Sequence, residues 1–356
     1  MNKNFWKNKK VFVTGHTGFK GSWLCLWLHS MGANVTGYSL SPPSSPNLFE
    51  SIGLDSFINS IVGDIRNYSD MKEAIKDSSP EIIIHLAAQA LVRDSYEDPL
   101  TTYSTNVMGT VNLLEIVRQT PSVKSVVIVS SDKCYENKEW FWGYRENEPL
   151  GGYDPYSNSK ACTELVTSAY RSSFFQNKEK APHICSARAG NVIGGGDWSK
   201  DRLIPDIIRA FEKGERVVIR NPVSYRPWQY ILDLLRGYLT LAENLYLKGN
   251  DYSEAWNFGP SDGDTKTVEW IVENLADFWG GNCLWEIDSE GNLHEARHLK
   301  LDSSKAKTRL AWQPIISIDH ALRLIVEWHA SYRKAGNMYE ESLKEIRNYE
   351  ELLNEK

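Results

Sequence analysis

Hydrophobic residues in the first half of the chain alternate between short continuous runs and helical spacing. Between residues 23 and 31, tryptophan, leucine and methionine recur every three to four positions, and Gly32 follows as a helix stop. Near-continuous apolar strands separated by helices are typical of a parallel sheet that is covered on both faces. The runs that predict strands lie at residues 11–13, 34–40, 58–62, 82–86 and 126–129.

The second half is less regular. A strand-like run at 184–187 leads into Gly190-Asn191 and the glycines 194–196. The charged tail, residues 338–356, predicts a solvated terminal helix. We place the main division near residue 180 and expect some later segments to rejoin the sheet. Further helices are predicted at 202–213, 232–247, 268–279 and 318–332.

Composition narrows the class of protein. With 356 residues, 41% hydrophobic and 24% charged, the chain predicts two domains or one large α/β unit. The net charge of −6 argues against a nucleic-acid binder. Five scattered cysteines without a C-x-x-C spacing suit a reducing compartment, and we expect no metal site. Without an 18-residue apolar run or a signal peptide, we expect a cytoplasmic protein with no membrane span.

The strongest local signal is Thr14-Gly15-His16-Thr17-Gly18-Phe19-Lys20-Gly21, between a predicted strand and a predicted helix. Glycines there allow a tight turn and a close approach of backbone to a pyrophosphate, and the helix N-terminus favours negative charge. The motif predicts dinucleotide binding. A glycine turn without a ligand is the alternative, since the spacing is G-x-x-G-x-x-G.

The choice of dinucleotide follows from what surrounds the second and third strands. The acidic residue that usually follows the second strand is missing, yet no Lys or Arg lies between Gly21 and Ile65 to neutralise a 2′-phosphate. We therefore favour NAD. Asp64 is a candidate partner on the adenine side, and a solvated loop aspartate is the equal alternative.

Two further motifs carry candidate catalytic groups. Tyr156 and Lys160 form a Y-x-x-x-K pair on one face of a predicted helix. A nearby ammonium favours the phenolate, so the pair predicts a tyrosine base, although such pairs also occur by chance. Ser131, Asp132 and Lys133 follow the predicted strand 126–129 and are expected at the same carboxyl edge of the sheet as the glycine turn.

Together these motifs resemble the nucleotide-sugar 4,6-dehydratases of the extended short-chain dehydrogenase/reductase superfamily, along nearly the whole chain. The strings at 131–133 and 191–198, with Arg226-Pro227-Trp228, are most similar to the branch whose substrate is CDP-glucose. Other matching strings are His85-Leu86-Ala87-Ala88-Gln89, Asn106-Val107-Met108-Gly109-Thr110 and residues 226–231.

The resemblance implies a reaction on tightly bound NAD. Tyr156, helped by Lys160 and hydrogen-bonded through Ser131, takes the proton of the sugar O4 while hydride passes from C4 to NAD. Water then leaves from C5 and C6, with Asp132 protonating the C6 hydroxyl, and the hydride returns to C6. The product is CDP-4-keto-6-deoxy-D-glucose, which implies a place in O-antigen dideoxysugar synthesis for lipopolysaccharide.

One position departs from the related dTDP-glucose enzymes. Lys133 stands where they have a glutamate that is assigned as the C5 base. A neutral lysine could take the C5 proton, whereas a cationic one could only stabilise the enolate. Asp132 argues against an epimerase or simple reductase, which lacks this acid, and Lys133 argues against a dTDP-glucose or GDP-mannose dehydratase. Those enzymes remain the alternatives.

The resemblance also implies the binding residues and the architecture. A doubly wound parallel Rossmann sheet (1–180) binds the dinucleotide, and a smaller C-terminal mixed α/β domain (181–356) mainly binds the nucleotide sugar. A homodimer or homotetramer is implied. The expected cofactor contacts are Gly15, Gly18, Phe19, Lys20, Gly21, Asp64, Ile65, Leu86, Ala87, Ala88, Asn106, Tyr156 and Lys160. The expected substrate contacts are Gln89, Asn191, Arg202, Arg220, Arg226 and Arg297.

Overall fold

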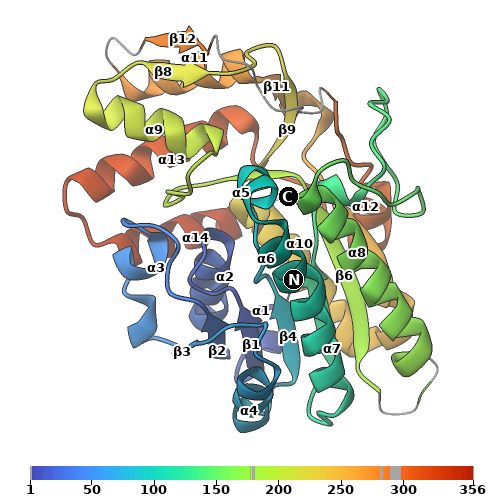
Figure 1. Cartoon of the computed structure of the whole chain (residues 1–356). Coiled ribbons are helices and arrows are strands. Elements are labelled where there is room, and N and C mark those ends of the chain that lie inside the picture. Colours follow the sequence, from blue (N-terminus) through green and yellow to red (C-terminus); the bar gives the residue numbers. More distant parts are fainter. Residues whose placement is uncertain (1, 177, 179–180, 281–283, 289–297, 356) are drawn as a thin grey trace.

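The computed structural model describes residues 2–176, 178, 181–280, 284–288 and 298–355. Its centre is a seven-stranded parallel sheet of order β10-β6-β5-β4-β1-β2-β3 (Figure 1). These strands are β1 (Lys10–Thr14), β2 (Asn34–Ser39), β3 (Asn59–Val62), β4 (Ile82–His85), β5 (Ser125–Val129), β6 (His183–Ala189) and β10 (Ala255–Phe258).

Helices cover both faces of this sheet because the strands bury side chains on both. Phe12, Ile83 and Val126 pack with α4 (Tyr68–Ser78), α7 (Gly109–Arg118) and α8 (Pro155–Tyr170). Their neighbours in the strands, such as Val11 and Val127, pack on the opposite face with α2 (Phe19–Ser30) and α10 (Ile231–Lys248). The predicted doubly wound parallel fold is confirmed.

The strand order reverses at β1, which pairs with β2 on one side and β4 on the other. In open α/β sheets, ligands bind outside the carboxyl ends of strands at such a switch point. Thr14 ends β1 opposite Tyr38 and His85, so the loops after β1, β2 and β4 share one edge.

The two small sheets of the C-terminal part lie above this carboxyl edge (Figure 1). A three-stranded sheet has the order β11-β9-β7 and a two-stranded sheet pairs β12 with β8. β6 and β10 lie after residue 180 and yet belong to the large sheet; the division near 180 stays a prediction. The elements of the C-terminal part are β7 (Asn191–Ile193), β8 (Val217–Ile219), β9 (Tyr225–Tyr230), β11 (Thr265–Thr267), β12 (Trp285–Ile287), α9 (Leu203–Lys213), α11 (Val268–Trp279), α12 (Ser304–Leu310), α13 (Ile318–Arg333) and α14 (Met338–Asn354).

Short helices complete the chain. α1 (Lys3–Trp6) precedes β1, and α3 (Leu48–Ser51) follows β2. α5 (Val92–Glu97) and α6 (Pro99–Tyr103) connect β4 to α7. No helix among the described residues is long and apolar enough to cross a membrane.

The terminal helix α14 is not solvated, contrary to the prediction from its charge. The Trp27 indole donates a hydrogen bond to Glu350 at 3.0 Å, and the Tyr349 hydroxyl donates to Asp233 at 2.7 Å. Ile346 and Tyr349 are buried in the main core. The helix docks because one face carries these groups, while Glu340, Lys344, Arg347 and Glu351 are exposed on the other.

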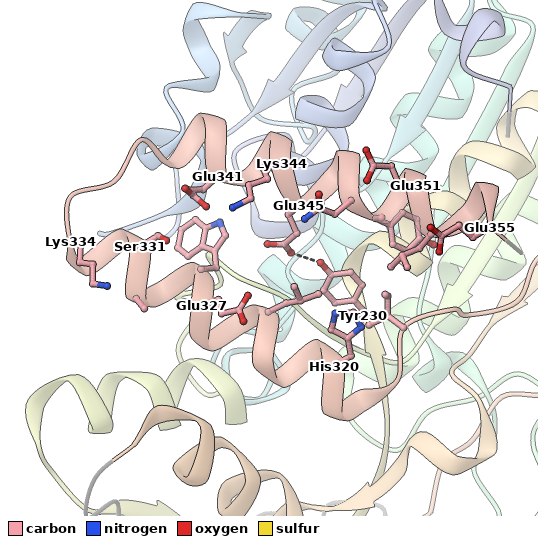
Figure 2. Close-up of a pocket in the computed structure, with 17 residues that line it drawn as sticks. Tyr230, His320, Glu327, Ser331, Lys334, Glu341, Lys344, Glu345, Glu351 and Glu355 are labelled. Carbon is pink, nitrogen blue, oxygen red and sulfur yellow. Dashed lines mark hydrogen bonds between the residues drawn. The ribbon is translucent and has the colours of Figure 1, made fainter.

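A hollow of about 650 Å³ lies between α13 and α14 (Figure 2). Charged side chains from both helices line it, and the Tyr230 hydroxyl donates a hydrogen bond to Glu345 inside it. Burial raises the pKa of Glu345 to about 8, and the charges of Glu327 and Glu341 act in the same direction. Tyr230 ends β9, so this hollow lies at the other end of that strand from Arg226.

Candidate active site

The glycine turn after β1 is shaped for close backbone contact. Gly15 has φ +77°, and a Cβ on it would lie 2.8 Å from the Ala87 nitrogen. A Cβ on Gly21 would lie 2.1 Å from the Gly15 oxygen. Gly18 is the N-cap of α2 and offers no side-chain cap, so the first turn of the helix keeps its N–H groups for a ligand. Phe19, the first residue of α2, is buried in the core.

The segment after β4 is fixed against this turn. The Thr14 hydroxyl accepts hydrogen bonds from the Leu86 and Ala87 amides, both at 3.1 Å. Asn106 accepts from the Gln89 amide at 2.8 Å and donates to the Gln89 carbonyl at 3.0 Å. The predicted cofactor residues 86–88 and Asn106 therefore form one hydrogen-bonded unit beside the glycine turn. The Gln89 side chain bonds the backbone of Leu91, so in this structure it positions its own loop.

Ser131, Asp132 and Lys133 form the turn that leaves β5. The Ser131 hydroxyl donates to Asp132 Oδ1 at 3.0 Å and accepts from the Lys133 amide at 3.2 Å. Asp132 is buried, and a Cβ on Gly190 would lie 2.8 Å from its Oδ2. Burial raises the pKa of Asp132, against the opposing charge of Lys133 and the hydrogen bond from Ser131. Burial thus favours the neutral form of this carboxyl.

Tyr156 and Lys160 lie on the first turns of α8. Burial raises the pKa of Tyr156 to about 12, against a hydrogen bond with the Ser131 hydroxyl. Lys160 is buried and donates to the Val129 carbonyl at 3.4 Å. Burial lowers the pKa of Lys160 to about 8, against the charge of Glu164. The structure thus brings the Tyr-Lys pair to the end of β5, beside Ser131.

Cations from three further elements lie near the side chains of Asp132, Tyr156 and Lys160. Lys20 of α2 has a pKa lowered to about 7, first by burial and then by the charges of Arg202 and Lys160. Arg202, the N-cap residue of α9, pairs with Asp197 at 3.1 Å. The charge of Arg226, on β9, acts on Asp132. The site therefore carries several cations near one edge, as an anionic ligand requires.

The remaining predicted substrate residues are less central. Arg220, which follows β8, pairs with Asp201 at 3.1 Å. Asn191 begins β7 and is partly buried opposite Trp228 of β9. Arg297 lies outside the described residues, so its predicted role stays a prediction.

Asp64 and Ile65 lie after β3. Asp64 pairs with Arg66 at 2.5 Å, and its pKa is lowered mainly by that hydrogen bond. Ile65 is buried against Gly109, where a Cβ would lie 2.5 Å from its Cδ1. Among the residues that the structure describes, no cluster of His, Cys, Asp and Glu could hold a metal ion.

Some residues at the site were not found from the sequence. The Ser95 hydroxyl accepts a hydrogen bond from the Tyr156 amide at 3.1 Å. Arg93, two residues earlier on α5, pairs with Asp201 at 3.0 Å. We expected substrate-binding arginines in the second half of the chain only. The signal available was that both residues closely follow the string ending at Gln89.

The comparisons with known proteins agree with this geometry. A family model described as GDP-mannose 4,6 dehydratase matches residues 12–325. A CDP-glucose 4,6-dehydratase of Salmonella typhimurium is 55% identical over 98% of both chains. A CDP-paratose 2-epimerase of Salmonella typhi is 31% identical over 90% of this chain and 99% of its own.

Solved structures show the same fold. A dTDP-glucose 4,6-dehydratase of Bacillus anthracis, in complex with NAD, has a TM-score of 0.75 at 24% identity, covering 92% of this chain and 98% of its own. A UDP-glucose 4-epimerase of Thermotoga maritima has a TM-score of 0.77 at 24% identity, covering 91% and 99%.

The doubly wound sheet, the glycine turn and the Tyr-Lys pair define an extended short-chain dehydrogenase/reductase. Within that superfamily, the chain belongs to the GDP-mannose 4,6-dehydratase family, whose model spans residues 12–325. The resemblance read from the motifs is confirmed.

Proposed function

We propose that this protein is a CDP-glucose 4,6-dehydratase that uses NAD. The observation that carries the proposal is the buried Asp132, hydrogen-bonded to Ser131 in the turn beside Tyr156. An acid at this position is what elimination needs beyond the oxidising tyrosine. The 55% identity over 98% of both chains to the Salmonella typhimurium enzyme supports the choice of CDP-glucose.

The residues present fit a dinucleotide. The Gly15 and Gly21 positions leave no room for a Cβ, and the uncapped start of α2 faces the turn that they form. Arg66, the cation that closely follows β3, is already engaged by Asp64, which supports NAD over NADP. Gly15, Gly18, Phe19, Lys20, Gly21, the 86–88 backbone and Asn106 would hold it, with Asp64 and Ile65 on the adenine side.

The chemistry of the chain follows from its proton donors and acceptors. NAD, when bound, would supply the hydride acceptor for the oxidation of the sugar and the hydride donor for the final reduction. Tyr156 takes the proton of the sugar O4, with Lys160 one helical turn further along α8 as its proposed partner. The hydrogen bond of the Ser131 hydroxyl and the charge of Arg202 favour the phenolate of Tyr156, against burial and the charge of Asp132. Asp132, whose pKa is raised by burial, donates its proton to the departing C6 hydroxyl. Lys133 lies beside Asp132. It either takes the C5 proton as a base or stabilises the enolate that forms when this proton is lost.

Substrate binding relies on the cations above the carboxyl edge. Arg202, Arg220 and Arg226 neutralise the diphosphate, and Arg297 is proposed with them. Asn191 and Gln89 contact the phosphate and the sugar. We further propose a cytoplasmic homodimer or homotetramer, which acts in O-antigen dideoxysugar synthesis for lipopolysaccharide and binds neither membrane nor nucleic acid.

The test is the mass of the product. The pure protein is incubated with NAD and, in separate tubes, with CDP-glucose, dTDP-glucose or GDP-mannose. Loss of one water from CDP-glucose alone, without net NADH, is expected. Loss of water from another nucleotide sugar instead would overturn the nucleotide choice. An isomer of unchanged mass would indicate an epimerase, and steady NADH a dehydrogenase.

A further inference from the structure

One carboxylate, that of Asp201, is shared by two arginines that come from different halves of the chain. Asp201 Oδ1 lies 3.0 Å from Arg93 Nη1 and 3.1 Å from Arg220 Nη2. Arg93 lies on α5, directly after the loop that follows β4. Arg220 follows β8 in the C-terminal part. The two guanidiniums and one carboxylate leave a net charge of +1 at this point.

These groups lie close to the candidate active site. Ser95, two residues after Arg93, accepts the hydrogen bond from the Tyr156 amide. Asp201 immediately precedes Arg202, whose charge acts on both Tyr156 and Lys20. Arg202 is also the N-cap residue of α9, and its side chain makes no capping hydrogen bond there. Asp201 is therefore paired with α5, whose Ser95 contacts the Tyr156 amide, and directly precedes the N-cap residue of α9.

The side chains remain accessible to a ligand. Those of Arg93, Arg220 and Asp201 are 42%, 34% and 25% exposed. Partly exposed ion pairs contribute little stability, about 0–1 kcal/mol, so this pairing is readily exchanged. A diphosphate offers more charge and more acceptor oxygens than one carboxylate, and guanidinium groups bind phosphate in a bidentate manner.

We propose that Arg93 joins Arg220 in binding the diphosphate of the nucleotide sugar, and that Asp201 occupies both guanidiniums until the diphosphate replaces it. The inference rests on the proposed function, which supplies a nucleoside diphosphate as ligand. Arg93 lies on α5, which follows β4 of the large sheet, whereas the other proposed diphosphate contacts belong to the C-terminal part. Asp201 lowers the affinity for the diphosphate and keeps the arginines positioned between turnovers.

The two variants Arg93→Gln and Asp201→Asn test this with opposite expected signs. Isothermal titration with CDP should give a dissociation constant raised about tenfold or more for Arg93→Gln, because one charge-assisted contact is lost. Asp201→Asn should bind CDP several-fold more tightly than the wild type, because the competing charge is gone. CMP, which lacks the second phosphate, should respond less to both changes.

A matched control is available in the same segment. Lys200 pairs with Asp94 at 3.2 Å, next to the Asp201 pairing, and the Lys200 side chain is 67% exposed. Lys200→Gln should bind CDP like the wild type, and thermal melting should show that all variants fold.

The outcomes separate the inference from the proposed function. If Asp201→Asn weakens CDP binding, Asp201 supports the site and the exchange is wrong. If Arg93→Gln binds CDP like the wild type, Arg93 lies outside the site. A wild type that binds UDP or dTDP in place of CDP overturns the proposed substrate, and the same two variants with that nucleotide still decide the inference. A wild type that binds no nucleoside diphosphate overturns both.

Discussion

Glu164 and Arg188 form an ion pair of 2.8 Å in the interior, with their side chains 3% and 4% exposed. The Ser186 hydroxyl donates to the same carboxylate oxygen at 2.6 Å. Glu164 lies one helical turn after Lys160, and its charge raises the pKa of Lys160 against the effect of burial. The Glu164 carboxylate therefore favours the protonated form of Lys160, which lies on the same helix as Tyr156.

Glu164→Gln should shift the pH dependence of turnover. The folded pKa of Lys160 is about 8, so turnover should decline on the alkaline side as pH rises through that value. Removing the negative charge destabilises the ammonium, so the decline should begin at lower pH in the variant. The measurement is kcat against pH. A fall in kcat by the same factor at every pH would mean that Glu164 acts on folding alone.

Asp132→Asn should separate oxidation from elimination. The amide fills the same space and cannot supply a proton, so we expect elimination to slow by about 10²–10⁴. NADH fluorescence should then appear and persist in a single turnover with CDP-glucose. If NADH does not form at all, Asp132 is needed already for oxidation and its role as the acid is wrong.

Lys133→Met should also slow elimination more than oxidation. The side chain is partly exposed in the turn after β5, so the change is not expected to disturb the core. Rapid mixing with CDP-glucose and NAD, followed by NADH fluorescence and product mass, measures both steps. An equal loss in the two rates would show that Lys133 only positions the substrate.

Gly15→Ala should abolish cofactor binding. The φ of +77° costs an L-residue about 1–2 kcal/mol, and the new methyl group would lie 2.8 Å from the Ala87 nitrogen. Titration with NAD measures the loss of cofactor affinity, and thermal melting measures the loss of stability. Gly263→Ala is the control, because a Cβ there would have no atom within 4 Å. Its free energy of unfolding should stay within about 0.5 kcal/mol of the wild-type value. Wild-type NAD affinity in Gly15→Ala would contradict the role of the glycine turn in binding the cofactor.

Glu345→Gln should stabilise the protein at alkaline pH. The folded pKa of Glu345 is about 8, above its ordinary value of 4.5, so the folded protein holds a proton that the unfolded chain releases. Its contribution is complete below pH 4.5 and is lost as pH rises through 8. Urea unfolding at about pH 6 and about pH 9 should therefore show a larger gain for the variant at the higher pH. Glu351→Gln, exposed on the same helix, is the control and should show no such difference.

The local parts of the fold could be predicted from the sequence. The helix expected at 268–279 has those bounds in α11, because Thr267 caps its start and Gly280 ends it. β10 was not predicted as a strand, since Asn257 interrupts its apolar pattern. Asn257 is nevertheless fully buried, because Tyr135 and the Tyr144 carbonyl satisfy its amide.

The candidate site also has a part that the sequence predicts and a part that it does not. The glycine turn and the Ser131–Lys133 turn are contiguous motifs, so their residue types revealed them. The pairing of Arg93 with Asp201 joins positions 108 residues apart, and no local pattern links the two residues. The docking of α14 through Glu350 likewise depends on Trp27, which no pattern within the helix reveals.

The position of β10 also constrains how the chain folds during synthesis. β6 is covered on its outer side by a strand made of residues 255–258, which leave the ribosome after β7, β8 and β9. Until then β6 exposes an unpaired edge of an apolar parallel sheet, which is a template for aggregation. Nascent chains that end before residue 255 should therefore depend on chaperones, whereas chains that reach past Phe258 can close the sheet themselves.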